Sequence, residues 1–441
     1  MGIKLINKTL GPSYKNKSIS NNFTGKNILV VGDIMLDRYY FGNSYRMSPE
    51  APVPVLLETK QEYSIGGAGN LALNIKSLGS EVELTSATGN DKEGFKLLEL
   101  VEASKLHVTM AQDHKVTTTK TRLVGQQGQH IVRWDREELY EGNLIERFYN
   151  SIKKTDIICI SDYAKGTVKR DTIGKLLGKD AKILVDPKQD ANLYHGAYLV
   201  KPNMQEYEAW FGTYDKANAL RQMHRLDWTW LVVTDGAKGM HVLNNKGEYQ
   251  HFVEPVKEVA DVTGAGDTVM AVIAYGIDKG IDIFESCKLA CYAAARIVEK
   301  RGVAIIQQDD LERNIVWTNG VFDILHTGHL KLLRHAHTLG KRLVVGINSD
   351  SSVKRLKGDL RPINDQNTRK EALLELGYVD DVVIFEEDTP YEIIKEIQPD
   401  VIVKGGDYTV EQVVGNDIAK VEIFPTVEGH STTKTIERMK A

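Results

Sequence analysis

The sequence is poor in cysteine. Its 441 residues include three, Cys159, Cys287 and Cys291, and an odd number cannot form a closed set of disulfides. Cys287 and Cys291 are four residues apart in an apolar segment, with no histidine or third cysteine near them in the sequence. A metal-binding pair is therefore disfavoured, and we expect small, buried hydrophobic residues at these positions.

Long hydrophobic runs and an excess of one charge are also absent. No run approaches the roughly 18 apolar residues of a membrane span, and residues 1–8 lack the apolar core of a signal peptide. The 56 basic and 60 acidic residues give a net charge of −4, which offers no basic surface for nucleic acid or an anionic membrane. We expect a cytoplasmic protein that binds neither nucleic acid nor membrane.

Length and composition indicate a globular protein of more than one domain. The chain is 42% apolar and 26% charged, as is usual for soluble domains, and 441 residues exceed one ordinary domain. We expect a polar N-terminal tail at 1–24, a first domain at 25–305, a polar linker at 306–315 and a second domain at 316–441.

The most informative stretch is DVTGAGDT at 261–268. The apolar run that follows this stretch lacks strand-like alternation and so predicts a buried helix. Residues 261–268 would then form the start of that helix. The small residues Gly264 to Gly266 let a ligand approach the backbone, and the N–H groups of a helix start bind anions. Beside a phosphoryl group in transfer, the Asp267 carboxylate is suited to take a proton from an attacking hydroxyl.

The rest of the first domain has the pattern of a parallel sheet covered on both faces. Its apolar runs are short, do not alternate and are separated by helical lengths. We expect strands in or near 27–33, 157–162, 183–186, 198–201 and 230–234. Asp37 and Arg38 are expected on a loop after the first strand. Residues 40–60 contain Pro49, Pro52 and Pro54, which favour a sheet edge or a separate flap. Such a flap either closes over a ligand or pairs with the same flap of another subunit.

Residues 261–267 resemble the signature of the ribokinase-like sugar kinases. The resemblance implies that Asp267 is the catalytic base. It implies an anion hole at Gly264, Ala265 and Gly266. It implies nucleotide and magnesium contacts at Asn203, Glu206, Thr234, Gly236 and Gly239. Sugar or sugar-phosphate contacts are expected at Asp33, Asp37, Arg38, Gly66, Gly67, Asn70, Arg133, Lys165 and Lys188.

A second strand-to-turn pattern begins at Ile315, and a His-x-Gly-His motif follows it. Helical spacing after the motif places His329 at a helix start and His326 one turn earlier. Two imidazoles there can donate to phosphate oxygens without a metal. Surface polarity and a zinc site are the alternatives, but zinc needs a third protein ligand and none is evident nearby.

This half resembles the nucleotidyltransferases that move a nucleotidyl group onto a phosphate. The resemblance implies that both histidines stabilise charge on the α-phosphate. Nucleotide contacts are expected at Thr318, Asn319, Gly320, Phe322, Asp323, Arg361, Lys404, Gly405, Asp407, Ser431, Thr432 and Thr433.

Together the two halves resemble the bifunctional heptose 7-phosphate kinase / heptose 1-phosphate adenylyltransferases of bacterial lipopolysaccharide inner-core synthesis. The implied fold is α/β, with a ribokinase-like doubly wound sheet and a β flap followed by a smaller, Rossmann-like nucleotidyltransferase domain. The implied cofactors are ATP and Mg²⁺, the metal arriving with ATP rather than at a direct protein site. The implied partners are heptose phosphates, a separate heptose bisphosphate phosphatase and a second copy in a homodimer.

Two alternatives stay open on the sequence alone. The enzyme pair could act on another sugar phosphate or use CTP. From a different class, the chain could be a sugar-binding regulator with decayed catalysis, although decay predicts a missing base or histidine and Asp267, His326 and His329 are all present.

Overall fold

The computed structural model describes residues 4–6, 28–113, 115–140, 156–177, 180–254, 261–300, 304–311, 314–406 and 408–425. The chain divides into two compact units, Met1–Leu311 and Glu312–Ala441. Within the described residues, no helix combines the length and apolar character needed to cross a bilayer.

The first unit is built on a ten-stranded sheet, counting the described residues, in the order β1-β6-β5-β2-β9-β10-β11-β12-β13-β14. All neighbouring pairs are parallel except β12 with β13 and β13 with β14. The strands are β1 (Lys4–Ile6), β2 (Ile28–Gly32), β5 (Val82–Gly89), β6 (His107–Asp113), β9 (Ile157–Ser161), β10 (Lys182–Asp186), β11 (Leu199–Val200), β12 (Trp230–Thr234), β13 (Met240–Asn244) and β14 (Tyr249–Phe252).

The N-terminal segment contributes to this sheet, where we expected only a polar tail. Strand β1 pairs in parallel with β6 at its edge. Its three residues, Lys-Leu-Ile, are too short a run to stand out among the polar residues around them. The rest of the expected tail lies outside the described residues.

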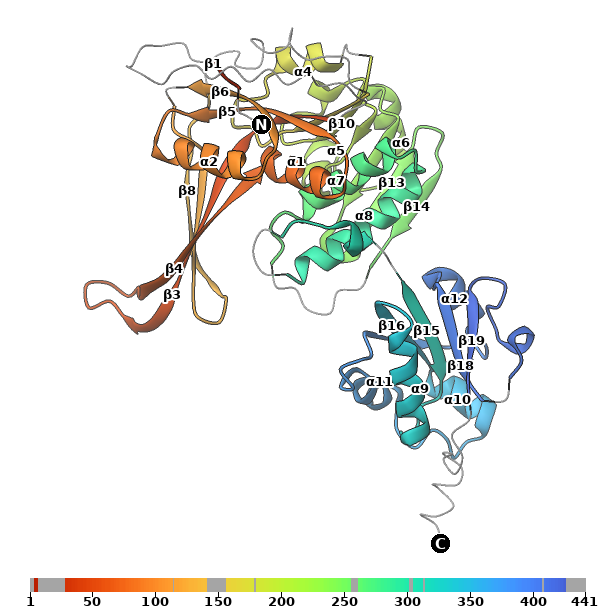
Figure 1. Ribbon diagram of the computed structural model, residues 1–441. Helices are drawn as coiled ribbons and strands as arrows, with labels where there is room; N and C mark the ends of the chain where they lie inside the picture. The colour runs from red at the N-terminus through yellow and green to blue at the C-terminus, as the bar shows by residue number, and fades with distance from the viewer. Residues whose placement is uncertain are drawn as a thin grey trace. The chain divides into compact units, whose positions relative to one another are not determined.

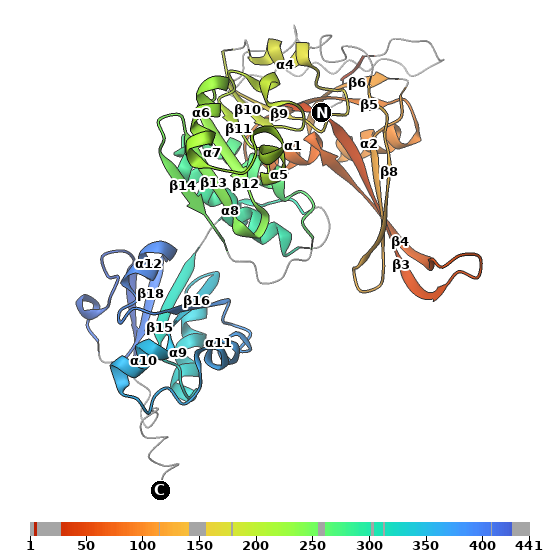
Figure 2. The same ribbon diagram turned by 180° about the vertical axis from the view of Figure 1, so that it is seen from behind.

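Helices cover both faces of the sheet, as the unalternating strands predicted (Figures 1 and 2). One face packs against α1 (Ala68–Ser77), α2 (Lys92–Ala103), α7 (Ala265–Asp278) and α8 (Ile283–Val298). The other face packs against α4 (Arg170–Leu177), α5 (Met204–Phe211) and α6 (Lys216–Leu226).

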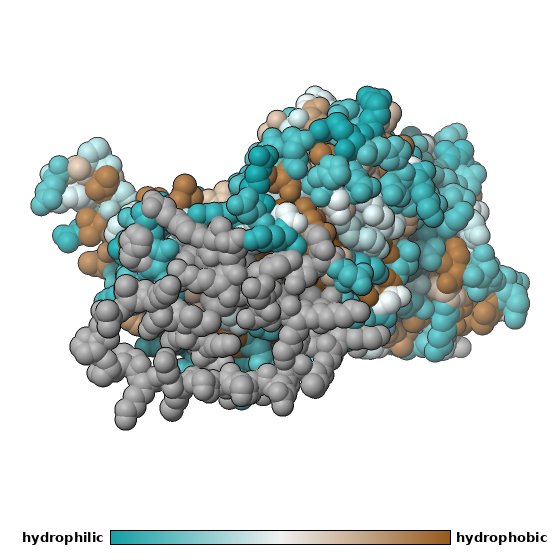
Figure 3. Space-filling view, turned by 90° about the horizontal axis from the view of Figure 1, so that it is seen from above, coloured by the Kyte–Doolittle hydropathy of each residue, from teal (hydrophilic) through white to brown (hydrophobic). Residues whose placement is uncertain are grey.

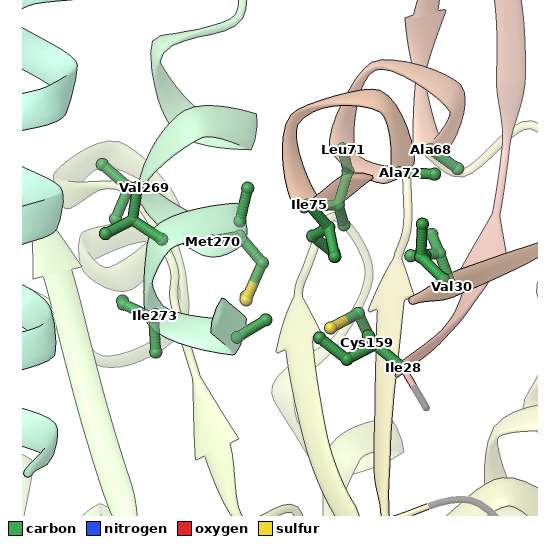
Figure 4. Packing of buried hydrophobic residues seen from close by; sticks show 14 of the residues in the cluster. Ile28, Val30, Ala68, Leu71, Ala72, Ile75, Cys159, Val269, Met270 and Ile273 are labelled. Carbon is green, nitrogen blue, oxygen red and sulfur yellow. The ribbon is translucent and has the colours of Figure 1, made fainter. Parts of the chain in front are cut away.

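Helices α1 and α7 pack against each other in the core of the first unit. Figure 4 shows Met270 of α7 lying between the two helices, near Leu71 and Ile75 of α1, with Cys159 of β9 beneath. All four side chains are fully buried. All three cysteines are buried and none forms a disulfide, and the burial of Cys287 and Cys291 was expected.

A second, four-stranded sheet forms the flap, in the order β4-β3-β7-β8. Its strands are β3 (Ile34–Met47), β4 (Pro54–Gly67), β7 (Thr119–Val124) and β8 (His130–Arg136). Asp37 and Arg38 therefore lie within strand β3, not on a loop, because β3 pairs with β4 and β7 on its two sides. The far ends of β3 and β4 extend beyond the body of the first unit (Figures 1 and 2), and Figure 3 shows apolar side chains among hydrophilic ones at this tip. Met47, Val53 and Leu57 are exposed there.

The expected linker at 306–315 belongs in large part to the first unit. Ile306 is fully buried in the core of that unit. A short 3-10 helix follows at Gln308–Leu311, and the Gln308 side chain donates to the Leu78 carbonyl at the end of α1. Asp310 in the same segment pairs with Lys300 just after α8, so polar side chains of the expected linker bond within the first unit.

The second unit is a five-stranded parallel sheet, counting the described residues, in the order β17-β16-β15-β18-β19. Helices α9 and α11 pack on one face and α12 on the other. The elements are β15 (Ile315–Gly320), α9 (Thr327–Thr338), β16 (Arg342–Asn348), α10 (Asp350–Lys357), α11 (Gln366–Leu374), β17 (Asp381–Phe385), α12 (Tyr391–Ile397), β18 (Val401–Gly405) and β19 (Lys420–Phe424).

The packing between α1 and α7 predicts a stability effect. Met270→Ala removes a fully buried side chain and should lower the free energy of unfolding of the first unit by about 2–5 kcal/mol. Met47→Ala is the matched control, because Met47 is 57% exposed at the flap tip and its loss should stay within about 0.5 kcal/mol. Urea titration of both variants checks this, and equal midpoints would contradict the packing described.

Candidate active sites

The strand order predicts one ligand site in each unit. In the first sheet, β2 pairs with β5 on one side and with β9 on the other, and the strand order runs in opposite directions from this point. In the second, β15 lies between β16 and β18. Ligands of doubly wound sheets bind at the carboxyl ends of the strands where the order reverses. The ends of β2 and β9, and of β15 and β18, are therefore the expected sites.

Asp267 lies in the first turn of α7 and is 5% exposed. Its carboxylate accepts hydrogen bonds from Asn70 Nδ2 at 2.8 Å and from the Tyr163 hydroxyl at 2.9 Å. Burial raises the pKa of Asp267 to about 6, with nearby Asp186 adding to the rise and both hydrogen bonds opposing it. A carboxylate with this pKa is ionised at neutral pH yet basic enough to accept a proton.

The small residues before Asp267 start the helix in the manner the sequence indicated. Gly264 caps α7 with φ 83°, a left-handed conformation that glycine adopts without strain. The Ala265 N–H donates to the Val262 carbonyl at 3.3 Å, so this amide already has a partner inside the turn. The first-turn N–H of Gly266 has no acceptor within a regular helix, which makes it the better candidate of the two for an anion.

A buried lysine that was not among the predicted site residues lies beside this turn. Lys201, just after β11, is 3% exposed and pairs with Asp186 at 3.0 Å. A Cβ placed on Gly266 would lie 3.6 Å from Lys201 Nζ. The charge of Lys201 opposes the rise in the Asp267 pKa. Its position at a strand end, before Pro-Asn, was the available sequence signal.

The double glycine at the end of β4 lets the flap strands join helix α1 with close backbone contacts. A Cβ on Gly66 would lie 2.1 Å from the Asp37 carboxylate, and Gly67 has φ +59° with its missing Cβ 2.3 Å from the Asp33 carbonyl. Asp37 itself is buried and forms an ion pair with Arg122. Arg122 was not predicted.

Asp33, which was predicted at the sugar, has its carboxylate bonded to the backbone of a loop. Its carboxylate is 1% exposed and accepts the backbone N–H groups of Tyr163, Lys165 and Thr167 at 2.9–3.0 Å. These three bonds fix the loop after β9, which carries the Tyr163 hydroxyl to Asp267. Asp33 is therefore a loop-positioning residue.

The two segments expected at the nucleotide lie side by side. Asn203 forms a parallel bridge with Thr234 at the end of β12. Asn203 and Glu206 form a capping box at the start of α5, and Glu206 also pairs with Lys188 at 2.9 Å. Lys188, which was predicted at the sugar phosphate, thus lies against the segment that starts α5.

The glycines of the next turn, Gly236 and Gly239, both have positive φ. A Cβ on Gly239 would lie 1.9 Å from the Phe252 carbonyl, so the turn needs glycine for its own packing. Within the described residues, no cluster of three or more His, Cys, Asp and Glu side chains is placed to hold a metal.

The other predicted cations each have a carboxylate partner. Arg38 pairs with Glu93, Arg133 with Asp135 and Lys165 with Glu137. A cation that sequence reasoning missed, Lys120 on β7, lies with its Nζ 5.2 Å from the centre of the Tyr163 ring. Burial lowers the pKa of Lys120.

In the second unit, the two histidines lie together at the start of α9. His326 is the N-cap residue, and its ring stacks on that of His329 with centroids 3.8 Å apart. Burial lowers the pKa of His329 to about 4, and the neighbouring His326 adds to this effect. Phe322, expected at the nucleotide, lies with its ring centre 4.9 Å from that of His329 and has φ 48°.

Lys404 on β18 lies beside β15, the first strand of the second unit, because these two strands are neighbours in the sheet. Its Nζ donates to Asn319 Oδ1 at 3.2 Å and to the Asn319 carbonyl at 3.3 Å. Burial lowers the pKa of Lys404. Thr318 is fully buried, whereas Gly320 and Gly405 at the two strand ends are half-buried.

Asp323, which was predicted at the nucleotide, has its carboxylate bonded to the 361–364 segment. Its buried carboxylate accepts from Arg361 Nε at 2.7 Å and from the N–H groups of Ile363 and Asn364 at 2.9 Å. Asp323 and Arg361 therefore hold the 361–364 segment beside the first strand. The predicted contacts Asp407, Ser431, Thr432 and Thr433 lie outside the described residues.

Comparison with known proteins agrees with this division. Residues 26–310 match the pfkB family of carbohydrate kinases, and residues 317–438 match the cytidylyltransferase-like family. A relative from Nitratiruptor sp., named "Bifunctional protein HldE", is 40% identical over 94% of this chain and 99% of its own length. One of the same name from Coxiella burnetii is 39% identical, covering 93% of this chain and 97% of that protein.

The chain belongs to the HldE family of bifunctional proteins. It is accordingly an enzyme with a carbohydrate kinase unit and a nucleotidyltransferase unit. The HldE assignment confirms the bifunctional kinase and transferase that the combined motifs predicted.

Solved structures confirm the kinase fold. Phosphofructokinase-2 from Escherichia coli superposes with a TM-score of 0.57 at 18% identity, covering 65% of this chain and 96% of that one. Ribokinase from Thermotoga maritima gives 0.54 at 20% identity, covering 65% and 98%.

The stacked histidines predict a response to nucleotide. In the free protein His329 should stay neutral until the pH falls to about 4, and added ATP should raise its pKa because phosphate charge favours imidazolium. Histidine-labelled NMR measures this, with His329→Gln identifying the resonance. A free-protein pKa near the usual 6.5 that ATP leaves unchanged would contradict the site.

Proposed function

We propose that the chain catalyses two steps of ADP-heptose biosynthesis. The kinase unit transfers the γ-phosphoryl group of ATP to the anomeric hydroxyl of D-glycero-D-manno-heptose 7-phosphate, giving the 1,7-bisphosphate and ADP. The transferase unit joins AMP from ATP to heptose 1-phosphate, giving ADP-heptose and pyrophosphate. The buried Asp267, ionised yet basic at the start of α7, is the observation that carries the kinase step.

In the kinase step, Asp267 accepts the proton of the anomeric hydroxyl while that oxygen attacks the γ-phosphorus and the bond to ADP breaks. The N-terminus of α7 and the Lys201 ammonium group face the charge that develops on the transferred group. The Tyr163 hydroxyl and Asn70 hold the Asp267 carboxylate in place.

Magnesium fits this site as an ion delivered with ATP. It usually takes one or two protein carboxylates plus phosphate oxygens and waters, and Glu206 lies at the nucleotide segment. Bound there, Mg²⁺ would neutralise phosphate charge. Asn203 and Glu206 would hold its water shell.

In the transferase step, an oxygen of the sugar 1-phosphate attacks the α-phosphorus of ATP, and pyrophosphate leaves. His326 and His329 donate hydrogen bonds to the α-phosphate as its charge grows, and Lys404 adds a buried cation at the neighbouring strand end. Asn319 holds the Lys404 ammonium group toward that edge.

Two further partners belong to the proposal. The kinase product carries two phosphates and the transferase substrate carries one, so a separate phosphatase acts between the two steps. A second copy of the chain is the proposed partner of the flap, because Met47, Val53 and Leu57 expose apolar area at its tip and an unpaired sheet edge favours pairing.

Separate mutation of the two sites tests the division of labour. Asp267→Asn keeps the shape and removes the base, so kinase turnover should fall by about 10²–10⁴-fold while adenylyl transfer continues. His329→Ala should cut adenylyl transfer by about 10²–10³-fold and leave phosphorylation intact. Both reactions are assayed on both variants, with CTP replacing ATP in a parallel transferase assay.

The controls make this test decisive. Each variant must melt cooperatively like the parent. If one substitution silenced both reactions in a folded protein, the sites would not be separate, and faster turnover with CTP would overturn the adenylyl assignment.

Lys120 offers a test of substrate recognition. It lies beside Tyr163, which touches the base, so Lys120→Met should raise KM for heptose 7-phosphate at least about 10-fold, as expected for a lost charge-assisted bond. KM for unphosphorylated heptose should hardly change. Lys188→Met is the matched control because Lys188 pairs with Glu206 on the nucleotide side. Equal increases for both sugars would rule out a phosphate contact.

A further inference from the structure

The last part of the first unit is tied to helix α1, which carries Asn70. The Ile306 N–H donates to Asn74 Oδ1 at 2.9 Å, and the Ile306 carbonyl accepts from the Ser77 hydroxyl. Asn74 is fully buried. The proposed mechanism gives none of these three residues a role.

Asn74 in turn contacts the residue that touches the base. Asn74 and Asn70 are four residues apart on α1 and so share one face of the helix. Asn74 Nδ2 donates to Asn70 Oδ1 at 3.1 Å and to the Asn70 carbonyl at 2.8 Å. Asn70 Nδ2 donates to Asp267 Oδ2 at 2.8 Å. A buried series of hydrogen bonds therefore runs from Ile306 to the base.

We infer that Asn74 and the backbone N–H of Ile306 are positioning groups for the kinase reaction, which through Asn70 ensure that a donor faces Asp267. An asparagine side chain has a donor end and an acceptor end of nearly the same shape, and its surroundings decide which way it points. A backbone N–H can only donate. The Ile306 N–H must therefore face Asn74 Oδ1, and this leaves Asn74 Nδ2 to face Asn70.

The same reasoning fixes the second amide. Asn70 Oδ1 must face the Asn74 donor, so Asn70 Nδ2 is left to face Asp267. Were Asn70 reversed, its oxygen would lie against the carboxylate, and that arrangement would favour a protonated Asp267 unable to act as a base. Two backbone groups that cannot exchange donor and acceptor roles, the Ile306 N–H and the Asn70 carbonyl, thus agree in setting the direction of both amides.

Other charged and titratable groups around Asp267 come from different elements. Tyr163 follows β9 and bonds to the carboxylate, Asp186 ends β10, and Lys201 follows β11. Removing Asn74 leaves all three in place. A change in the titration of Asp267 would therefore report on the amide series.

This inference rests on the proposed role of Asp267, and Asn74→Leu tests it. Leucine has nearly the size of asparagine but cannot donate to Asn70. The pH profile of kinase kcat/KM should move upward by roughly one pH unit, because a carboxylate that loses a charge-assisted donor is easier to protonate. The titrations of ATP and the sugar phosphate are common to all variants and cancel in the comparison.

Ser77→Ala is the matched control, since it breaks the other bond between α1 and Ile306 without touching the amide series. Its profile should coincide with that of the parent. If Asn74→Leu does not melt cooperatively, Asn74→Ser replaces it, being too short to reach both Asn70 and Ile306. Adenylyl transfer should stay at the parent rate in all variants.

The outcomes separate the two claims. An Asn74 variant that is folded and keeps the parent profile, while Asp267→Asn is inactive, overturns the positioning role alone. An active Asp267→Asn overturns the proposed base and the inference with it.

Discussion

Burial of the Asp267 carboxylate is the constraint on which the kinase unit depends. Removing a charged group from water is costly unless hydrogen bonds and nearby charges offset the loss. Asn70 and Tyr163 supply the bonds, and Lys201 supplies the opposing charge. Each comes from a different element of the fold, so α1, the loop after β9 and the end of β11 must all be in place before the base has its properties.

The sequence predicts the parts of this arrangement that are local. Short apolar runs mark the strands, and small residues before Asp267 mark the helix start, because close backbone approach and a left-handed φ require them. The paired histidines at the start of α9 are local in the same sense, since helical spacing alone brings them together.

The sequence could not predict the roles of residues whose hydrogen-bond partners lie far away along the chain. Asp33 and Asp323 each follow the first strand of a doubly wound sheet, and both look like ligand-binding carboxylates. Each instead accepts N–H groups of a loop, 130 residues away for Asp33 and Tyr163 and 40 away for Asp323 and Ile363. Nothing local distinguishes an aspartate that holds a loop from one that holds a substrate. Ile306 was misassigned to a linker for the same reason, because its partner Asn74 lies 232 residues earlier.

Burial shifts the pKa of the central residue in opposite directions in the two sites. Burial raises the pKa of Asp267 and lowers that of His329, and in each case it favours the uncharged form. A bound nucleotide brings negative charge to both sites. This charge helps the histidines, because it favours imidazolium and so adds a donor for the phosphate. It works against Asp267, because it favours the protonated acid. In the proposed mechanism, the kinase site therefore needs cations that the transferase histidines do not. The Lys201 ammonium group and the magnesium ion proposed to arrive with ATP would keep Asp267 ionised when substrate is bound.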